Sequence, residues 1–95
     1  MKIYIAGKIT DNPNYKKQFA AAERFLRKKG HTIMSPAVLP AGFEHFEYMR
    51  ICYSMIDVCE GVFFLRNWAD SKGAMMEHDY AGNWGKVIMY QAHMA

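Results

Sequence analysis

The residues best suited to chemistry are Asp70, Ser71, Gly73 and Glu77, which occupy the start of a predicted helix. Either Asp70 or Ser71 can cap that helix by accepting a hydrogen bond from a free backbone amide. Gly73 leaves the first turn open to a ligand, and the free amides there favour an anion. The Glu77 carboxylate leans back toward the same helix end, where it can act as a nucleophile or a general base. In the alternative, Asp70 and Ser71 only cap the helix and Glu77 pairs with a surface cation.

A second candidate segment is the loop that begins Gly7-Lys8-Ile9, directly after the first predicted strand. Glycine permits a tight turn there, and backbone amides together with Lys8 can hold a phosphate. The loop has neither a Walker motif nor a full dinucleotide fingerprint, so an ordinary strand-to-helix turn is the alternative. Tyr4 on the preceding strand is either a core residue or a hydroxyl donor to Glu77 or a ligand.

Trp68 precedes Ser71 in the same predicted loop, where it can stack on a base, wall a pocket or only pack the loop. The spacing of these residue types does not indicate a Cys–His or Ser–His–Asp catalytic arrangement. We expect no metal, because no histidine has a metal-binding spacing; the histidines are His31, His45, His78 and His93. No organic cofactor is expected either.

The composition indicates one domain, residues 1–95, that forms a homodimer or higher homo-oligomer. Eight methionines and fourteen aromatic residues are many for a chain of 95 residues, and exposed apolar patches mark interfaces. The alternative is a loosely specified core in which methionine fills gaps. Cys52 and Cys59 lie seven positions apart on one predicted helix, a rise of about 10.5 Å, which is too far for a disulfide. Reduced cysteines, with no signal peptide or membrane span, predict a cytoplasmic protein.

The net charge of +3 comes largely from one predicted helix that carries Lys16, Lys17, Arg24, Arg27, Lys28 and Lys29. Such a run is usually a solvated helix face. A nucleic-acid groove would interleave basic residues with exposed aromatic ones. We therefore expect neither nucleic acid nor a membrane as partner.

Short apolar runs alternate with helical periodicity along the chain. Strands are predicted at Ile3–Ala6, His31–Met34, Val62–Leu65 and Val87–Tyr90, and helices at Tyr15–Lys29, Phe46–Cys59 and Ser71–Trp84. This β-α-β-α-β-α-β order predicts an α/β fold: a three-layer, flavodoxin-like, four-stranded parallel sheet with helices on both faces. Ligands bind beyond the carboxyl ends of such strands, so loops 7–14, 35–44 and 66–73 are expected to converge on one site.

Together, these residues resemble the nucleoside 2-deoxyribosyltransferase superfamily. The similarity covers most of the chain: Lys2-Ile3-Tyr4-Ile5-Ala6-Gly7 is similar to the family's first strand and loop, and Phe63-Phe64-Leu65 followed by Ser71-x-Gly73-x-x-x-Glu77-x-x-x-Ala81 to its strand-loop-helix signature. The longer run from Trp68 to Ala81 is typical of short, uncharacterised bacterial and phage proteins grouped with this superfamily.

The resemblance implies an enzyme that cleaves the N-glycosidic bond of a (deoxy)nucleoside or its 5′-monophosphate, as a hydrolase or a base-exchange transferase. Glu77 takes the role of the nucleophile, and Tyr4 that of a tyrosine that contacts it. Ser71, the amides near Gly73 and the loop Gly7-Lys8-Ile9 match the part that holds the 5′ end of the substrate. Trp68 or Tyr48 is expected to pack on the base.

One departure weakens the catalytic reading. The family carries an Asp on the helix before the signature, and the matching position here is Cys52. Asp57, five residues further on, and Glu47 are possible substitutes for this Asp. In the alternative, Asp57 is an ordinary exposed helix residue that faces elsewhere. The chain is also shorter than the catalytic members. The alternative hypothesis is therefore a nucleotide- or nucleotide-sugar-binding module, a sensor or interaction protein that performs no turnover.

Overall fold

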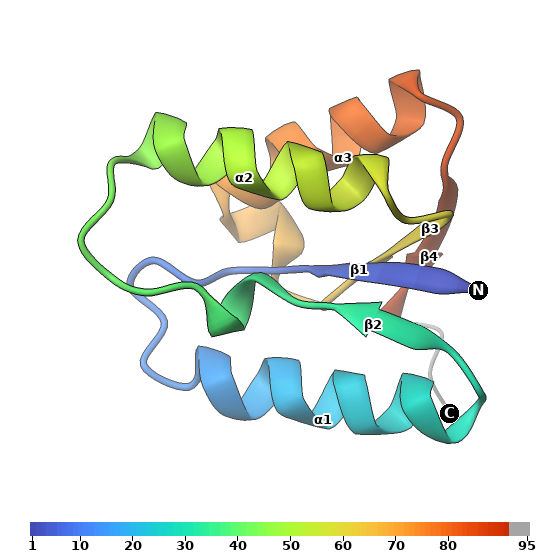
Figure 1. Ribbon diagram of the computed structural model, residues 1–95. Helices are drawn as coiled ribbons and strands as arrows, with labels where there is room; N and C mark the ends of the chain where they lie inside the picture. The colour runs from blue at the N-terminus through green and yellow to red at the C-terminus, as the bar shows by residue number, and fades with distance from the viewer. Residues whose placement is uncertain (92–95) are drawn as a thin grey trace.

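The computed structural model describes residues 1–91 and forms three layers, with one sheet between two layers of helices (Figure 1). The strands are β1 (Lys2–Ala6), β2 (Thr32–Met34), β3 (Gly61–Phe64) and β4 (Val87–Tyr90). Helix α1 (Tyr15–Lys28) covers one face of the sheet, and α2 (His45–Asp57) and α3 (Lys72–Asn83) cover the other. The predicted α/β class with helices on both faces is confirmed.

All four strands are parallel and lie in the order β2-β1-β3-β4. The chain leaves β1 toward β2 on one side and returns to pair β3 on the other, so the direction of winding reverses beside β1. Parallel sheets of this kind leave a crevice at the carboxyl ends of the strands where the winding reverses.

The alternation of side chains along β1 divides the core into two clusters. Ile3 and Ile5 face α1 and pack against Phe19 and Leu26. Tyr4 and Ala6 face α2 and α3, in a cluster that also includes Cys52, Ile56, Cys59, Val62, Phe64 and Ala81. Tyr4 is fully buried in the central part of the sheet.

Several predicted boundaries were wrong by one or two residues. Helix α2 begins at His45, because Glu44 and Glu47 form a capping box there, and it ends at Asp57. The expected loops contain two short 3₁₀ helices, η1 (Pro36–Val38) and η2 (Trp68–Asp70). The second of these turns the chain so that Trp68 points away from the start of α3.

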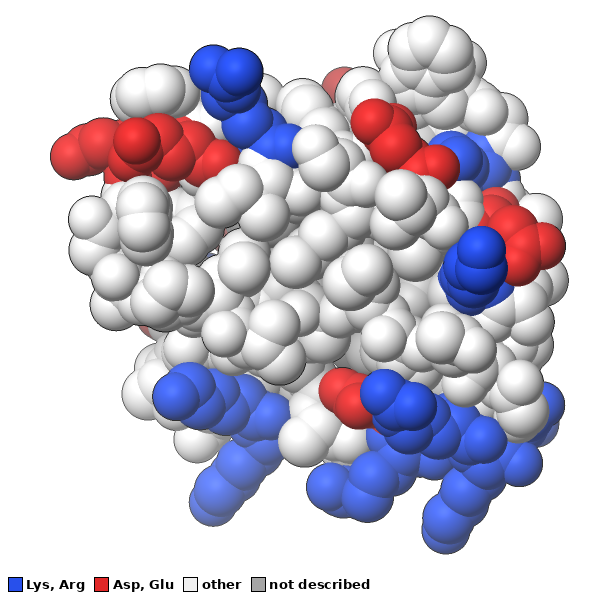
Figure 2. All heavy atoms as spheres, in the orientation of Figure 1, with Lys and Arg blue, Asp and Glu red and all other residues white. Residues whose placement is uncertain are grey.

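The surface is electrostatically uneven. Figure 2 shows Lys and Arg side chains gathered along α1, the helix at the bottom of Figure 1. One of them, Arg27, pairs with Glu23 at 2.8 Å on the same helix.

Within residues 1–91, no helix is both long enough and apolar enough to cross a membrane. Cys52 and Cys59 are both buried and unpaired.

Candidate active site

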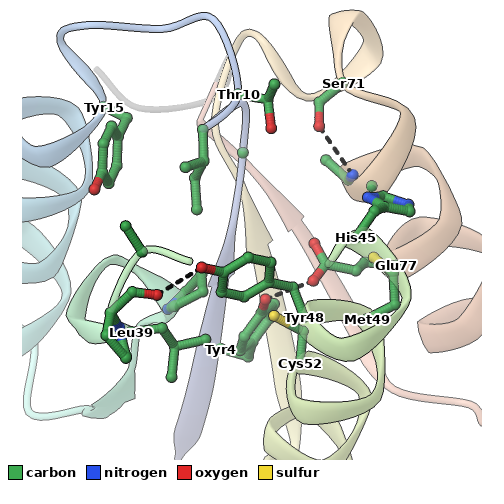
Figure 3. A pocket seen from close by; sticks show the side chains of 17 residues that line it. Tyr4, Thr10, Tyr15, Leu39, His45, Tyr48, Met49, Cys52, Ser71 and Glu77 are labelled. Carbon is green, nitrogen blue, oxygen red and sulfur yellow. Dashed lines mark hydrogen bonds between the residues drawn. The ribbon is translucent and has the colours of Figure 1, made fainter. Parts of the chain in front are cut away.

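A cavity of about 240 Å³ lies at the carboxyl end of β1, where the winding reverses (Figure 3). Three loops line it, as predicted. Gly7, Ile9 and Thr10 come from the loop after β1, and Ser71 comes from the turn before α3. The loop after β2 contributes Pro36, Leu39, Pro40 and Ala41. The N-terminal parts of α2 and α3 complete the wall.

Tyr4, Cys52 and Glu77 meet at the base of this cavity, one each from β1, α2 and α3. The Tyr4 hydroxyl donates a hydrogen bond of 2.5 Å to Glu77 Oε2. The Cys52 sulfur points toward the same two groups (Figure 3). Glu77 is only 5% exposed, although it is an ionisable residue. Charged side chains are rarely buried to this degree unless they are paired, so the carboxylate occupies a costly position.

Burial sets the protonation of all three groups, because it disfavours their charged forms. It raises the pKa of Glu77 to about 7, against the smaller opposing effect of the hydrogen bonds from Tyr4 and Cys52. Burial, and then the nearby Glu77 charge, raises the pKa of Cys52 to about 12 and that of Tyr4 well above its ordinary value. Near neutral pH, Tyr4 and Cys52 are therefore neutral hydrogen-bond donors, while Glu77 exchanges a proton.

The first turn of α3 forms one side of the cavity. Ser71 is the N-cap, and its Oγ accepts a hydrogen bond of 3.1 Å from the amide of Ala74. A Cβ atom added to Gly73 would lie 3.5 Å from Met49 Sδ, 3.6 Å from His45 Cε1 and 3.9 Å from Ser71 Oγ. Glycine at this position therefore keeps open a space that three other lining residues surround.

Tyr48 of α2 holds the loop after β2 against this helix through hydrogen bonds. Its hydroxyl donates to the carbonyl oxygen of Pro40 at 2.6 Å and accepts from the amide of Phe43 at 3.3 Å. Its ring lies edge-on to Phe43, with 5.9 Å between centroids. Pro36 and Leu39 of this loop give the cavity an apolar side.

The structure brings most of the sequence-predicted site residues to this cavity. They are Tyr4, Gly7, Ile9, Tyr48, Cys52, Ser71, Gly73 and Glu77. Gly7 has a packing reason of its own, because an added Cβ would lie 2.7 Å from Leu65 Cδ1.

Lys8, Trp68 and Asp70 do not line the cavity. The backbone of Lys8 is held by Asn67 and Asn12 at the edge of the loop. Trp68 stacks on His78, with centroids 4.3 Å apart, on the far side of α3. Asp70 is exposed within η2, and Ser71 provides the cap in its place.

Neither proposed substitute for the family's Asp reaches the cavity. Asp57 lies at the C-terminal end of α2, where its Oδ1 accepts a hydrogen bond of 2.5 Å from Tyr80. Glu47 bonds to the amide of Glu44 in the capping box. Among the described residues that line the cavity, Glu77 is the single carboxylate.

Three polar lining residues were not among the site residues predicted from the sequence: Thr10, Tyr15 and His45. His45 was considered only as a metal ligand. The loop after the first strand was the signal that could have included Thr10. In residues 1–91, no group of three or more His, Cys, Asp or Glu side chains is arranged to hold a metal ion. His93 lies outside the described residues.

The chain is similar in structure to two enzymes. It superposes on a 2-deoxyribosyltransferase from Leishmania mexicana with a TM-score of 0.71 and 23% identity. The superposition covers 94% of this chain and 62% of the other chain. With a 2-deoxyribosyltransferase from the psychrotolerant bacterium Bacillus psychrosaccharolyticus, the TM-score is 0.70 and the identity 26%, over 95% and 71% of the two chains. The chain thus spans less than two thirds of the length of the first.

No curated protein matches the chain in sequence. A family model matches residues 1–90, nearly the full length, and that family is described as a domain of unknown function (DUF4406). The chain therefore belongs to the DUF4406 family, and its fold is that of the nucleoside 2-deoxyribosyltransferase-like superfamily.

Proposed function

We propose that this protein cleaves the N-glycosidic bond of a (deoxy)nucleoside or its 5′-monophosphate, with Glu77 as the nucleophile. The observation that carries the proposal is the buried Glu77 carboxylate, which lines a cavity and accepts a hydrogen bond from Tyr4. Perturbed ionisable groups in a cavity are typical of catalytic sites. The likeness of fold to two 2-deoxyribosyltransferases supports the same reaction class.

In the proposed reaction, a carboxylate oxygen of Glu77 bonds to the anomeric carbon as the N-glycosidic bond breaks. The bonding electron pair leaves with the base, which takes a proton from water. The hydroxide left behind attacks the glycosyl ester, releases the sugar and restores the carboxylate. A second base that attacks in place of hydroxide, and gives up its own proton to it, yields an exchanged nucleoside.

The cavity offers space on both sides of Glu77 for such a substrate. The apolar side formed by Leu39, Pro36 and Tyr48 suits a nucleobase. The side near Ser71 and Gly73 suits the sugar and its 5′ end. This arrangement brings the anomeric carbon next to Glu77, as attack at about 3–3.5 Å requires.

A second candidate is a nucleotide-binding module that performs no turnover. Most glycosidases use a pair of carboxyl groups, one of which assists the leaving group. Here Cys52 stands where a second acid would be useful, and burial raises its pKa to about 12. A thiol with this pKa is a poor proton donor to a leaving base at neutral pH, which favours binding over catalysis.

One experiment separates the two candidates. Purified protein is incubated at pH 8 with a panel of deoxynucleosides and their 5′-monophosphates, base release is followed by chromatography, and binding is measured by calorimetry. We expect base release by the wild type and a loss of at least about 10³-fold in Glu77→Gln. Glu47→Gln is the matched control, because Glu47 lies outside the cavity and Gln also completes a capping box.

Each result has a clear meaning. Binding without base release supports the binding module and rejects the enzyme. Release that persists in Glu77→Gln removes Glu77 as the nucleophile. If no nucleoside or nucleotide binds, both candidates are wrong.

We also infer that the protein is a homo-oligomer. Exposed apolar side chains on or next to α2 and α3 support this inference, among them Phe46 at 62%, Val58 at 58% and Trp84 at 67% exposure. Exposed apolar surface in excess of scattered single residues marks protein interfaces. Light scattering tests the inference, and a monomer at micromolar concentration would contradict it.

A further inference from the structure

The buried Glu77 carboxylate has neutral groups around it where a cation would be expected. Among the described residues that line the cavity, none is a lysine or an arginine. His45 is the one basic side chain there, and it is exposed beside Gly73. A buried charge is tolerated only where hydrogen bonds or opposite charges replace the water it has lost. The ionised form of Glu77 therefore depends on neutral hydrogen-bond donors.

Two such donors reach Glu77 from different elements. The Tyr4 hydroxyl on β1 donates to Oε2 at 2.5 Å. The Cys52 sulfur on α2 points toward both the Tyr4 hydroxyl and the carboxylate (Figure 3). Tyr4 has a single proton and gives it to Glu77, so it has none left to donate to the sulfur. Because an ionised carboxylate is the strongest acceptor of the three groups, the thiol proton goes to Glu77 as well.

The Cys52 thiol is suited to this role because it keeps its own proton. Burial, and then the Glu77 charge, raises the pKa of Cys52 to about 12, so the thiol is neutral whenever Glu77 is ionised. Burial raises the pKa of Glu77, and the hydrogen bonds from Tyr4 and Cys52 lower it. A thiol that is a poor acid is thus still a stable donor. The other ionisable side chains that line the cavity or act on these groups lie on α1 and α2: Tyr15, His45, Tyr48 and Tyr53.

We propose that Cys52 is a positioning residue, whose thiol donates a hydrogen bond to Glu77 and, together with Tyr4, holds the ionised carboxylate facing the cavity. The contact between Cys52 and Glu77 is independent of turnover, whereas its effect on catalysis rests on the proposed function. Cys52 acts through Glu77, without contact to the reacting atoms and without loss of its proton.

Cys59 provides a matched contrast. It is a second free thiol in the same core cluster, with 4% exposure against 6% for Cys52. It does not line the cavity. Burial raises the pKa of Cys59, while Lys86 and Lys2 lower it, so its electrostatic surroundings are cationic where those of Cys52 are anionic. Removal of the Cys59 thiol therefore reports the effect of a lost buried sulfur that has no contact with Glu77.

The test is a pH titration of the glutamate side-chain carboxyl carbons by NMR, in protein labelled with ¹³C-glutamate. The Glu77 signal is identified by its absence in Glu77→Gln. Cys52→Ala and Cys52→Val both remove the donor, and each is expected to raise the Glu77 pKa by at least about 0.5. Val fills more of the space than Ala, so at least one of these variants is expected to fold, as circular dichroism checks. Cys52→Ser keeps a donor, and its Glu77 pKa is expected to stay within about 0.3 of the wild type. Cys59→Ala leaves the Glu77 pKa unchanged.

Base release provides a second readout. In Cys52→Ala, kcat at pH 7 is expected to fall by at least about threefold, while KM stays within about twofold of the wild type. The loss is expected to shrink at pH 9, where Glu77 is ionised in both proteins. Cys52→Ser recovers the rate at pH 7, and Cys59→Ala retains it.

The outcomes separate the inference from the proposed function. An unchanged Glu77 pKa in the donor-free variants overturns the inference, whatever the activity of the protein. An equal rise in Cys52→Ser or in Cys59→Ala also overturns it, because packing and not the donated proton would then be the cause. If the Glu77 pKa responds as expected but the wild type releases no base, the contact is supported and the proposed enzymatic function fails.

Discussion

Glu77 and His78 are consecutive residues of α3 with very different surroundings. Glu77 faces the cavity, where Tyr4 donates a hydrogen bond to it. His78 faces Trp68 and β4 and is enclosed by rings. It stacks on Trp68 with 4.3 Å between ring centroids, its ring centroid lies 4.9 Å from that of Phe64, and its Nε2 is 2.6 Å from the Tyr90 hydroxyl. One turn of one helix thus supports two ionisable side chains with different roles.

The difference lies in the space beside each side chain. The group around Glu77 lies beside a cavity that a ligand can enter. The group around His78 is filled by aromatic rings, which stabilise the fold by packing against one another. An ionisable residue with a cavity beside it is therefore a better candidate for chemistry than one enclosed by rings.

The largest expected effect concerns the pH dependence of stability. The pKa of Glu77 is raised from an ordinary 4.5 to about 7, so the folded protein binds more protons than the unfolded chain between these values. Its stabilising effect is fully present below about pH 4.5 and is lost as the pH rises through 7. We expect the free energy of unfolding to fall by about 3 kcal/mol from pH 4.5 to pH 8 on this account.

Urea denaturation across this pH range measures the effect. Glu77→Gln removes the carboxyl group, so its stability is expected to vary much less between pH 4.5 and pH 8 than that of the wild type. Equal pH dependence in the two proteins would mean that Glu77 does not titrate in this range. Glu47→Gln serves as the control, because it removes a carboxyl group that lies outside the cavity and leaves the Glu77 carboxyl unchanged.

The second prediction concerns the aromatic side of the comparison. Trp68→Ala removes the ring that stacks on His78 and packs near Phe64, and it is expected to lower the free energy of unfolding by about 2 kcal/mol. Because Trp68 does not line the cavity, nucleotide affinity at a temperature well below the melting point is expected to be unchanged. A selective loss of binding in this variant would show that Trp68 contacts the ligand after all.

The third prediction concerns the hydrogen bond between Tyr4 and Glu77. Tyr4→Phe removes the donor that helps to stabilise the buried carboxylate, so it raises the pKa of Glu77 further and costs about 1.5 kcal/mol of stability at pH 8. The cost is expected to shrink at pH 5, where Glu77 is protonated. If base release is observed, the pH at which its rate begins to increase should be higher than in the wild type. A cost that is the same at both pH values would contradict the coupling.

The smallest expected effect compares two glycines. Gly73→Ala places a methyl group among Met49, His45 and Ser71 at ordinary contact distances, so it is expected to stabilise α3 by about 0.5–1 kcal/mol while it obstructs ligands. Gly7→Ala is the contrast, because its methyl group would collide with Leu65, and it destabilises the fold. Thermal melts and nucleotide titrations of both variants test the pair. Unchanged affinity in Gly73→Ala would show that the ligand does not enter this space.

The sequence predicts the elements of this fold better than the details of the site. Strand and helix patterns follow from local hydrophobic periodicity, and the parallel sheet follows from their alternation. Ser71 was identified as a possible cap because it stands at the start of a helical pattern. Tyr4 was identified as a possible partner of Glu77 chiefly from the family resemblance, since that contact joins β1 to α3. The roles of the predicted site residues remain predictions.

The misplaced residues share a different cause. Trp68 was expected beside the ligand, but the 3₁₀ turn at residues 68–70 directs it to β4, and nothing in the local sequence distinguishes the two directions. His45 was not considered as a ligand-binding residue, because its closeness to Gly73 depends on how α2 packs on α3. Contacts between elements far apart in sequence are not encoded in the spacing of any single segment.

The alternation of side chains along β1 means that an insertion or deletion in this strand would change the core and the site together. Ile3 and Ile5 fill one cluster while Tyr4, between them, reaches Glu77 on the other face. Insertion or deletion of one residue within β1 would reverse every side chain that follows it. Descendants of this chain can therefore lengthen or shorten the surrounding loops and so alter what they bind, whereas the length of this one strand is not free to vary.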